Sequence, residues 1–269
     1  MSTEKRTIDW YNRHAEEYLA HISDSHDSPY HAYYEKPAIR GELPNLKGKS
    51  VISLGCAAGR EDVRYLKDQG ASRVVGIDLA EKLIDLAKKM YPDCEFYVMD
   101  MEKLEFDDET FDLAYSGLAI HYLIGGFDRA MAEAFRVLRP GGTLLFSDGH
   151  PVNSAMEYTR DDDQVREKTL GVRTDKVKNT GEVIGDYLTS RSMITELLKG
   201  ETRVSDPLTF WHQPLSATIN QIISAGFKLE KVIEPLPTEG FKEASPRHFE
   251  RLSKIPEMIV FKASKLKVN

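Results

Sequence analysis

The chain has few of the features that would place it outside the ordinary globular proteins. It contains only two cysteines, Cys56 and Cys94, in 269 residues. Two cysteines are too few for a disulfide framework, which favours a reducing compartment and predicts a cytoplasmic protein. No stretch approaches the roughly 18 consecutive apolar residues of a membrane span, and residues 1–10 lack the apolar core of a signal peptide. We therefore expect a soluble protein without a membrane partner.

The chain also lacks an excess of positive charge. Lysine and arginine number 36 against 43 aspartates and glutamates, for a formal net charge of −7. A non-specific nucleic-acid binder needs a basic face to displace counterions, so this balance argues against that class. Hydrophobic residues at 41% and charged residues at 29% exclude wholesale disorder. No spacing of His, Cys and carboxylates matches a metal-ligand set, so no metal is predicted.

What the chain does have is an apolar run that ends in a turn of small residues. Residues 51–54 are nearly all apolar, which indicates a strand buried on both faces of a parallel sheet. Gly55 and Gly59, with the small Ala57 between them, permit a tight turn with positive φ and the close approach of a ligand. Residues 61–67 have helical spacing, so the free N–H groups at the start of this helix would face the turn.

Two of the following strands end in an acid. Asp78 ends the second strand 23 residues after Gly55, about the spacing at which an acid reaches a ribose diol in a doubly wound sheet. Asp100 ends the third strand. The predicted strands cover residues 51–54, 73–78, 96–100, 111–116 and 143–147. Taken singly, a glycine-rich strand, turn and helix also fits dinucleotide enzymes, phosphate binders and plain tight turns.

Five motifs in order, VISLGCAAG, GIDLAEKLIDLAK, VMDMEKL, FDLAYSGLAIHYL and RVLRPGG, resemble the core of the class I S-adenosylmethionine-dependent methyltransferases. The resemblance is to the broad type 11/25, small-molecule group, and it covers residues 51–147 strongly. The flanks, including WHQPLSATINQIISAGF, resemble this group more loosely. Two positions depart from the family pattern. Ser53 stands where the family usually has Asp or Glu, and Ala57 replaces the middle glycine of GxGxG.

The resemblance implies an α/β, doubly wound Rossmann-like fold. Its seven-stranded sheet would have the order 3-2-1-4-5-7-6, with the last strand antiparallel. We expect the last two strands at residues 227–233 and 258–261, after a helix that Ser216 caps and Gly226 stops. The implied domains are an N-terminal helical cap at 1–45, a cofactor-binding core at 46–150, an inserted substrate lid at 151–213, and a C-terminal helix with the last two strands at 214–269.

The resemblance also implies S-adenosyl-L-methionine as cofactor, with S-adenosyl-L-homocysteine as its product. Asp78 would accept hydrogen bonds from the ribose hydroxyls and Asp100 from the adenine amino group, although either acid could instead cap a helix. The expected cofactor-binding residues are Tyr11, Gly55, Cys56, Ala57, Gly59, Asp78, Leu79, Asp100, Met101, Ser116 and Leu118.

Residues 8–20 are predicted to form an amphipathic helix with Tyr11, Ala15, Tyr18 and Leu19 on one face. This helix either packs on the sheet edge or caps the cofactor. In a cap, a tyrosine ring would attract the sulfonium by a cation–π contact of about 0.5–2 kcal/mol, and Tyr11 is the expected ring.

His121, after the fourth strand, is the candidate catalytic residue. Methyl transfer from a sulfonium is an in-line displacement in which the enzyme mainly positions the nucleophile. A base is needed only where the acceptor must lose a proton, and a histidine can serve near neutral pH. The alternative is a histidine that packs on the cofactor or caps the helix at 127–138, and the sequence leaves both open.

The polar stretch that follows the fifth strand would lie at the carboxyl edge of the sheet, where a substrate lid fits. A hairpin is predicted from residues 172–177 and 183–188. His150, Trp211 and His212 are the candidate acceptor-binding residues.

Rival functions stay open on the residues alone. A nucleic-acid methyltransferase is disfavoured by the acidic balance and by the lack of both an Asn/Asp-Pro-Pro-Tyr motif and an RNA-binding module. A nicotinamide dehydrogenase fits Gly55 and Asp78 but not Asp100 with the RPGG turn. A non-catalytic S-adenosylmethionine-binding protein is suggested only by Ser53. We therefore expect a small-molecule substrate and no nucleic acid, with a monomer or homodimer.

Overall fold

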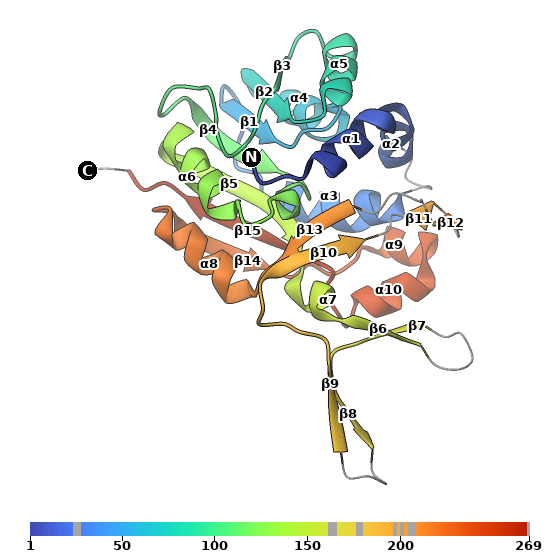
Figure 1. Ribbon diagram of the computed structural model, residues 1–269. Helices are drawn as coiled ribbons and strands as arrows, with labels where there is room; N and C mark the ends of the chain where they lie inside the picture. The colour runs from blue at the N-terminus through green and yellow to red at the C-terminus, as the bar shows by residue number, and fades with distance from the viewer. Residues whose placement is uncertain are drawn as a thin grey trace.

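The computed structural model describes residues 1–23, 28–160, 166–175, 180–195, 198–199, 202–203 and 208–267. Its centre is a seven-stranded sheet with the order β3-β2-β1-β4-β5-β15-β14 (Figure 1). The strands are β1 (Ser50–Leu54), β2 (Arg73–Asp78), β3 (Glu95–Val98), β4 (Phe111–Ser116), β5 (Leu138–Gly149), β14 (Lys228–Ile233) and β15 (Met258–Ser264). Neighbours from β3 to β5 are parallel, and β15 is antiparallel to both of its neighbours. The predicted Rossmann-like order 3-2-1-4-5-7-6 is confirmed.

The sheet is covered by helices on both faces, because successive side chains of each buried strand point to opposite sides. All five residues of β1 are buried. Ile52 and Leu54 pack on the face covered by α6 (Phe127–Val137) and α8 (Leu215–Ser224). Val51 packs on the opposite face. The helices there include the π-helix η1 (His31–Glu35), α3 (Lys36–Arg40), α4 (Tyr65–Asp68), α5 (Glu81–Met90), α9 (Glu239–Ala244) and α10 (Pro246–Leu252).

The N-terminal segment forms two helices, so the prediction of a single helix over residues 8–20 is wrong. α1 (Lys5–Arg13) and α2 (Ala15–Ser23) are separated at His14. The His14 backbone leaves the helical region, while its Nδ1 donates to the Trp10 carbonyl at 2.9 Å and its ring stacks on Trp10. The break turns α2 relative to α1, and α1 contacts both α5 and β13 (Leu208–His212).

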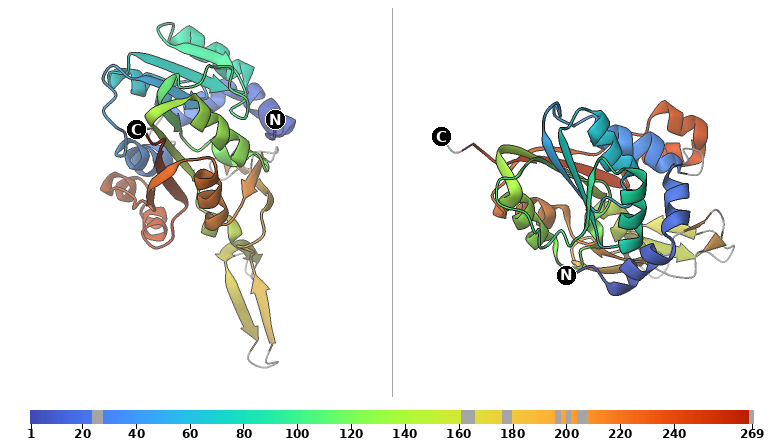
Figure 2. Two further views of the ribbon diagram at one scale, coloured as in Figure 1. Left: turned by 90° about the vertical axis from the view of Figure 1, so that its left-hand side faces the viewer. Right: turned by 90° about the horizontal axis from the view of Figure 1, so that it is seen from above.

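The stretch between β5 and α8 has a different architecture. It begins with α7 (Pro151–Ala155) and continues, in its described residues, as separate two-stranded pairs. These are β6 (Glu157–Arg160) with β7 (Arg166–Thr169), β8 (Gly171–Asp175) with β9 (Thr180–Ile184), β10 (Arg191–Thr195) with β13, and β11 (Leu198–Lys199) with β12 (Thr202–Arg203). The strands β8 and β9 extend away from the body of the protein (Figure 2). They correspond to the predicted hairpin, but its second strand covers Thr180–Ile184 rather than residues 183–188. Residues 176–179 lie outside the described residues.

Several element boundaries differ from the prediction. The stretch between the two predicted last strands contains α9 and α10. α8 starts at Leu215 after Pro214, one residue ahead of the predicted Ser216 cap. β3 ends at Val98, so Asp100 lies beyond the strand. In the part of the chain that the structure describes, no helix is both long enough and apolar enough to cross a bilayer.

Candidate active site

The loop from Gly55 to Gly59 joins β1 to the π-helix η2 (Arg60–Arg64) at the carboxyl edge of the sheet. Gly55 has φ +72° and Gly59 φ +74°, while Ala57 adopts φ +48° in spite of its Cβ. The amides of Gly55 and Cys56 both donate to the Ile77 carbonyl at 2.9 Å, which ties the loop to β2. A Cβ on Gly55 would lie only 2.4 Å from the Cβ of Ala119, so only glycine fits there.

Asp78 is held rigidly at the end of β2. Its Oδ2 accepts from the Ala57 amide and its Oδ1 from the Ala80 amide, each at 2.9 Å. Burial raises the pKa of the carboxyl, and these backbone donors lower it in part. Asp78 therefore braces the start of α5 and the glycine loop together, and each oxygen keeps acceptor capacity for a ligand.

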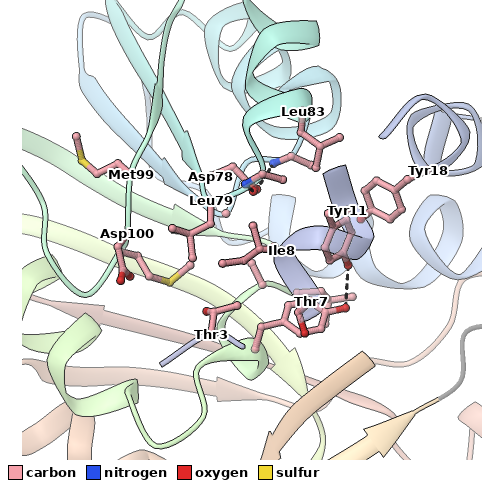
Figure 3. Close-up of a pocket in the computed structure, with 18 residues that line it drawn as sticks. Thr3, Thr7, Ile8, Tyr11, Tyr18, Asp78, Leu79, Leu83, Met99 and Asp100 are labelled. Carbon is pink, nitrogen blue, oxygen red and sulfur yellow. Dashed lines mark hydrogen bonds between the residues drawn. The ribbon is translucent and has the colours of Figure 1, made fainter. Parts of the chain in front are cut away.

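A cavity of about 670 Å³ opens beside Asp78, and we call it the nucleoside arm (Figure 3). Asp100 lines its far end, with Oδ1 accepting from the Glu102 amide at 3.0 Å. The predicted cofactor residues that line this arm are Tyr11, Gly55, Ala57, Asp78, Leu79, Asp100, Met101 and Leu118.

The other three predicted cofactor residues lie elsewhere. Cys56 and Gly59 line an adjoining cavity of about 490 Å³, which we call the amino-acid arm. Ser116 is fully buried, and its hydroxyl donates to the Leu54 carbonyl at 2.8 Å. That bond links β4 to β1, and Ser116 lines neither arm.

The two arms meet at four residues, which we call the junction: Tyr18, Gly55, Ala57 and Gly117 line both cavities. The amino-acid arm adds three carboxylates: Glu61, which pairs with Lys36 at 2.6 Å, and the unpredicted Glu35 from η1 and Asp62 from η2. Burial and the nearby Glu35 charge raise the pKa of Asp62 to about 8. No motif signals either acid, because they are far apart in the sequence and converge only in the folded chain.

Ser53, the position where the family usually has an acid, is fully buried. Its hydroxyl has no hydrogen-bond partner among the described residues. The carboxylates near the glycine loop therefore come from outside β1.

Tyr11 of α1 covers the nucleoside arm. Its hydroxyl shares a 2.8 Å hydrogen bond with that of Tyr122, drawn as a dashed line in Figure 3, and the two rings meet edge to face. Burial is the main cause that raises the pKa of both phenols, so both remain protonated. Helix α1 is thereby fastened across the cavity to the segment that follows β4.

His121 lies in the 3₁₀-helix Ile120–Tyr122, and its Nδ1 is 3.4 Å from Oδ1 of Asp148 at the end of β5. The Nδ1 atom is buried and makes no hydrogen bond within the described residues. Its ring packs on Tyr122, with centroids 4.3 Å apart. His121 and Asp148 line a third cavity, of about 410 Å³, together with Trp211 of β13. We did not predict Asp148 as the partner of His121, although its position at the end of the fifth strand could have indicated it.

The other two predicted acceptor residues are engaged within the protein. His150 is buried, with Nδ1 accepting from the Val152 amide at 3.2 Å and Nε2 3.0 Å from Glu234. His212 is buried between the Ser154 hydroxyl at 2.6 Å and the Tyr187 carbonyl at 3.0 Å, and burial lowers its pKa. Of the three, Trp211 lines the third cavity.

Known proteins resemble this chain in sequence and in fold. A family model described as a methyltransferase domain matches residues 52–146. An S-adenosylmethionine-dependent methyltransferase from Mesorhizobium loti, known from its crystal structure, is 30% identical with a TM-score of 0.68, over 85% of this chain and 96% of that one.

Two curated enzymes match about half of this chain. Malonyl-[acyl-carrier protein] O-methyltransferase from Salmonella typhimurium is 33% identical over 120 residues, 44% of this chain and 47% of that enzyme. Phthiotriol/phenolphthiotriol dimycocerosates methyltransferase 1 from Mycobacterium ulcerans is 32% identical over 142 residues, 52% of this chain and 51% of that enzyme.

Proposed function

Because this chain belongs to the S-adenosylmethionine-dependent methyltransferases, we propose that it transfers a methyl group to a small-molecule acceptor. When bound, S-adenosyl-L-methionine supplies the electrophilic methyl group, and S-adenosyl-L-homocysteine remains as product. The observation that carries the proposal is the pair of cavities that meet at the junction.

The residues of the two arms fit this cofactor. In the nucleoside arm, Asp78 and Asp100 are acceptors at two separate points, as a ribose diol and an adenine amino group require. In the amino-acid arm, Glu35 suits an ammonium group, while Asp62, whose pKa is raised to about 8, stays protonated near neutral pH and can donate to a carboxylate. An elongated ligand with a nucleoside at one end and an amino acid at the other matches this distribution of charges.

His121 is proposed to take the proton that the acceptor loses. Its 3.4 Å approach to Asp148 provides a carboxylate that stabilises the imidazolium once formed. Hydrogen bonds of this kind are often long before the substrate binds and tighten in the complex. Trp211 would contribute an apolar wall to the acceptor side.

The small-molecule acceptor is supported by the acidic net charge of −7, which disfavours a nucleic-acid substrate. It is supported further by the two curated relatives, whose names specify a malonyl group on an acyl-carrier protein and phthiotriol or phenolphthiotriol dimycocerosates.

Calorimetric titration with S-adenosyl-L-homocysteine, and separately with NAD, tests the donor site. We expect micromolar binding of the first and none of the second. Transfer of a labelled methyl group to a panel of hydroxyl, carboxyl, amine and thiol compounds, with tRNA included, then tests the acceptor class. Substituting His121→Gln should lower kcat about 100-fold or more while the dissociation constant of S-adenosyl-L-homocysteine stays within about twofold. Methylation of tRNA alone would contradict the small-molecule assignment.

A further inference from the structure

Residues 118–122, which follow β4, contribute to the walls of both the nucleoside arm and the third cavity. Leu118, Ala119 and Tyr122 line the nucleoside arm, whereas Ile120 and His121 line the third cavity. His121 lines neither the nucleoside arm nor the amino-acid arm. A change in backbone conformation at the start of this segment would therefore move side chains in both cavities.

The segment begins with a residue in an uncommon conformation. Leu118 adopts φ +46°, in the left-handed region that a bulky side chain rarely occupies. Its amide donates to the hydroxyl of Ser147, near the end of β5, at 3.0 Å. Such a conformation persists only where the surrounding structure holds it. The Ser147 hydroxyl is one of the groups that hold Leu118.

The same hydroxyl also contacts a buried carboxylate. Ser147 is fully buried, and its hydroxyl donates to Oε1 of Glu35 at 3.3 Å. Glu35 is 4% exposed and lines the amino-acid arm, and its Oε2 lies 3.5 Å from Nδ1 of His31. A hydroxyl that donates to a carboxylate becomes a better acceptor for a second donor. The charge at Glu35 therefore influences how strongly Ser147 binds the Leu118 amide.

Ser147 is also next to the proposed base and its partner. Asp148 follows it directly in β5, and Oδ1 of Asp148 lies 3.4 Å from Nδ1 of His121. This distance exceeds the upper limit of about 3.2 Å for an N–H···O hydrogen bond. Nδ1 of His121 is buried and makes no hydrogen bond within the described residues. A small shift of residues 118–122 relative to β5 would therefore decide whether His121 bonds to Asp148.

We propose that Ser147 is a positioning residue that links the amino-acid arm to the pair of His121 and Asp148. This link rests on the proposed function, in which the ammonium group of the donor pairs with Glu35 and His121 takes a proton. Once an ammonium shares the Glu35 carboxylate, the Ser147 hydroxyl is less polarised and holds the Leu118 amide less tightly. Residues 118–122 are then released to carry His121 toward Asp148. Binding of the donor in one cavity thereby prepares the base in another.

Nuclear magnetic resonance of the full chain with ¹³C-labelled histidine side chains tests this link. The His121 signal is identified by its absence in His121→Gln, and S-adenosyl-L-homocysteine, which keeps the ammonium, is added to saturation. The wild-type His121 signal should shift, although His121 lines neither arm. Ser147→Ala should lose about half or more of this shift while its dissociation constant stays within about threefold, because Ser147 also lines neither arm.

Ser116→Ala is the matched control. Ser116 is a fully buried serine at the end of the neighbouring strand β4, and its hydroxyl donates to the Leu54 carbonyl at 2.8 Å. Loss of this hydroxyl should leave the shift of the His121 signal as in the wild type. If Ser147→Ala fails to fold, Glu35→Gln takes its place. The amide cannot pair with an ammonium, so the shift should again be reduced at saturating S-adenosyl-L-homocysteine.

The outcomes separate the role of Ser147 from the proposed function. A wild-type protein that does not bind S-adenosyl-L-homocysteine overturns both. A wild-type protein that binds it without a shift of the His121 signal overturns the role of Ser147 alone. The same holds if the full shift survives in Ser147→Ala, or in Glu35→Gln where that variant replaces it. An equal loss in Ser116→Ala would also overturn it, because any buried hydroxyl at a strand end would then have the same effect.

Discussion

The seven-stranded sheet and the insertion between β5 and α8 obey different physical rules. In the sheet, β1 is buried along its whole length and pairs with β2 and β4. In the insertion, the described strands pair only two by two, and Val183 and Leu188 are 76% and 78% exposed. A residue of β1 is therefore held by several neighbours, whereas Val183 and Leu188 of the insertion are held by few.

The two regions accordingly contribute differently to the proposed donor site and the proposed acceptor cavity. The groups proposed to hold the donor sit at the carboxyl ends of buried parallel strands, where backbone bonds such as those to Asp78 fix them. The proposed acceptor cavity combines His121 and Asp148 at the sheet edge with Trp211 from the insertion. A donor site fixed by the sheet, beside an acceptor wall taken partly from an insertion, would allow one fold to serve many substrates.

The largest effect is expected from Asp78→Asn, which tests whether the end of β2 holds the donor. Loss of the charge should weaken S-adenosyl-L-homocysteine binding about 100-fold, since hydrogen bonds to a charged group contribute about 1.5–3 kcal/mol each. Titration calorimetry measures the change. The matched control is Asp112→Asn at the start of β4, where the carboxylate accepts from the Ser50 amide at 2.9 Å and pairs with Lys49. That variant should lose stability and keep its affinity within about twofold. Equal losses of affinity would contradict the assignment of Asp78.

The glycine loop offers a second test, through the free energy of unfolding. Gly55→Ala should cost about 1 kcal/mol for its positive φ and a further ~1–3 kcal/mol for the contact with Ala119. Gly48 has nearly the same φ, +75°, but a Cβ added there would meet no described atom within 4 Å, so Gly48→Ala should cost only the first amount. Urea denaturation of both variants isolates the contact. If the two lose equal stability, close packing does not restrict the loop.

The raised pKa of Asp62 predicts a pH-dependent effect on the stability of the fold. Because its pKa is raised from 3.8 to about 8, the folded protein holds a proton between these values that the unfolded chain has released. Ionisation of the unfolded chain therefore lowers the stability of the fold as the pH rises through this window. Asp62→Asn should therefore gain stability relative to the wild type as the pH rises from about 4 to about 8.5, by about 1.4 kcal/mol for each unit of the shift, with the difference vanishing near pH 4.

Thermal unfolding across this pH range checks the Asp62 prediction. Asp107→Asn, at an exposed aspartate, is the control and should show no such trend. A difference between Asp62→Asn and the wild type that stays constant with pH would show that the carboxyl is already ionised in the folded protein.

The smallest effect is expected in the insertion. Strands β8 and β9 pair with each other and extend away from the sheet, so replacing residues 172–183 by a short glycine-serine turn should leave S-adenosyl-L-homocysteine affinity within about twofold. Calorimetry on the shortened protein is the measurement. A tenfold loss would mean that the hairpin supports the donor site, and the contrast between the two regions would fail.

The sequence by itself determined the features that depend on short stretches of chain. The apolar run of β1, the positive-φ glycines and the spacing of Asp78 each follow from neighbouring residues, and together with the family resemblance they predicted the strand order and the cofactor correctly. The break at His14 escaped prediction, because the helical periodicity continues across it while the histidine ring bonds back to Trp10.

Only the tertiary structure decided which distant side chains meet. Glu35 and Asp62 converge on Gly117 from two separate π-helices, and His121 approaches Asp148 across the ends of two strands. The structure likewise turned His150 and His212 into buried partners of Glu234 and Ser154. A short stretch of sequence indicates backbone conformation and burial. Which charged side chains come into contact depends on how whole helices and strands pack, and this packing is a property of the complete fold.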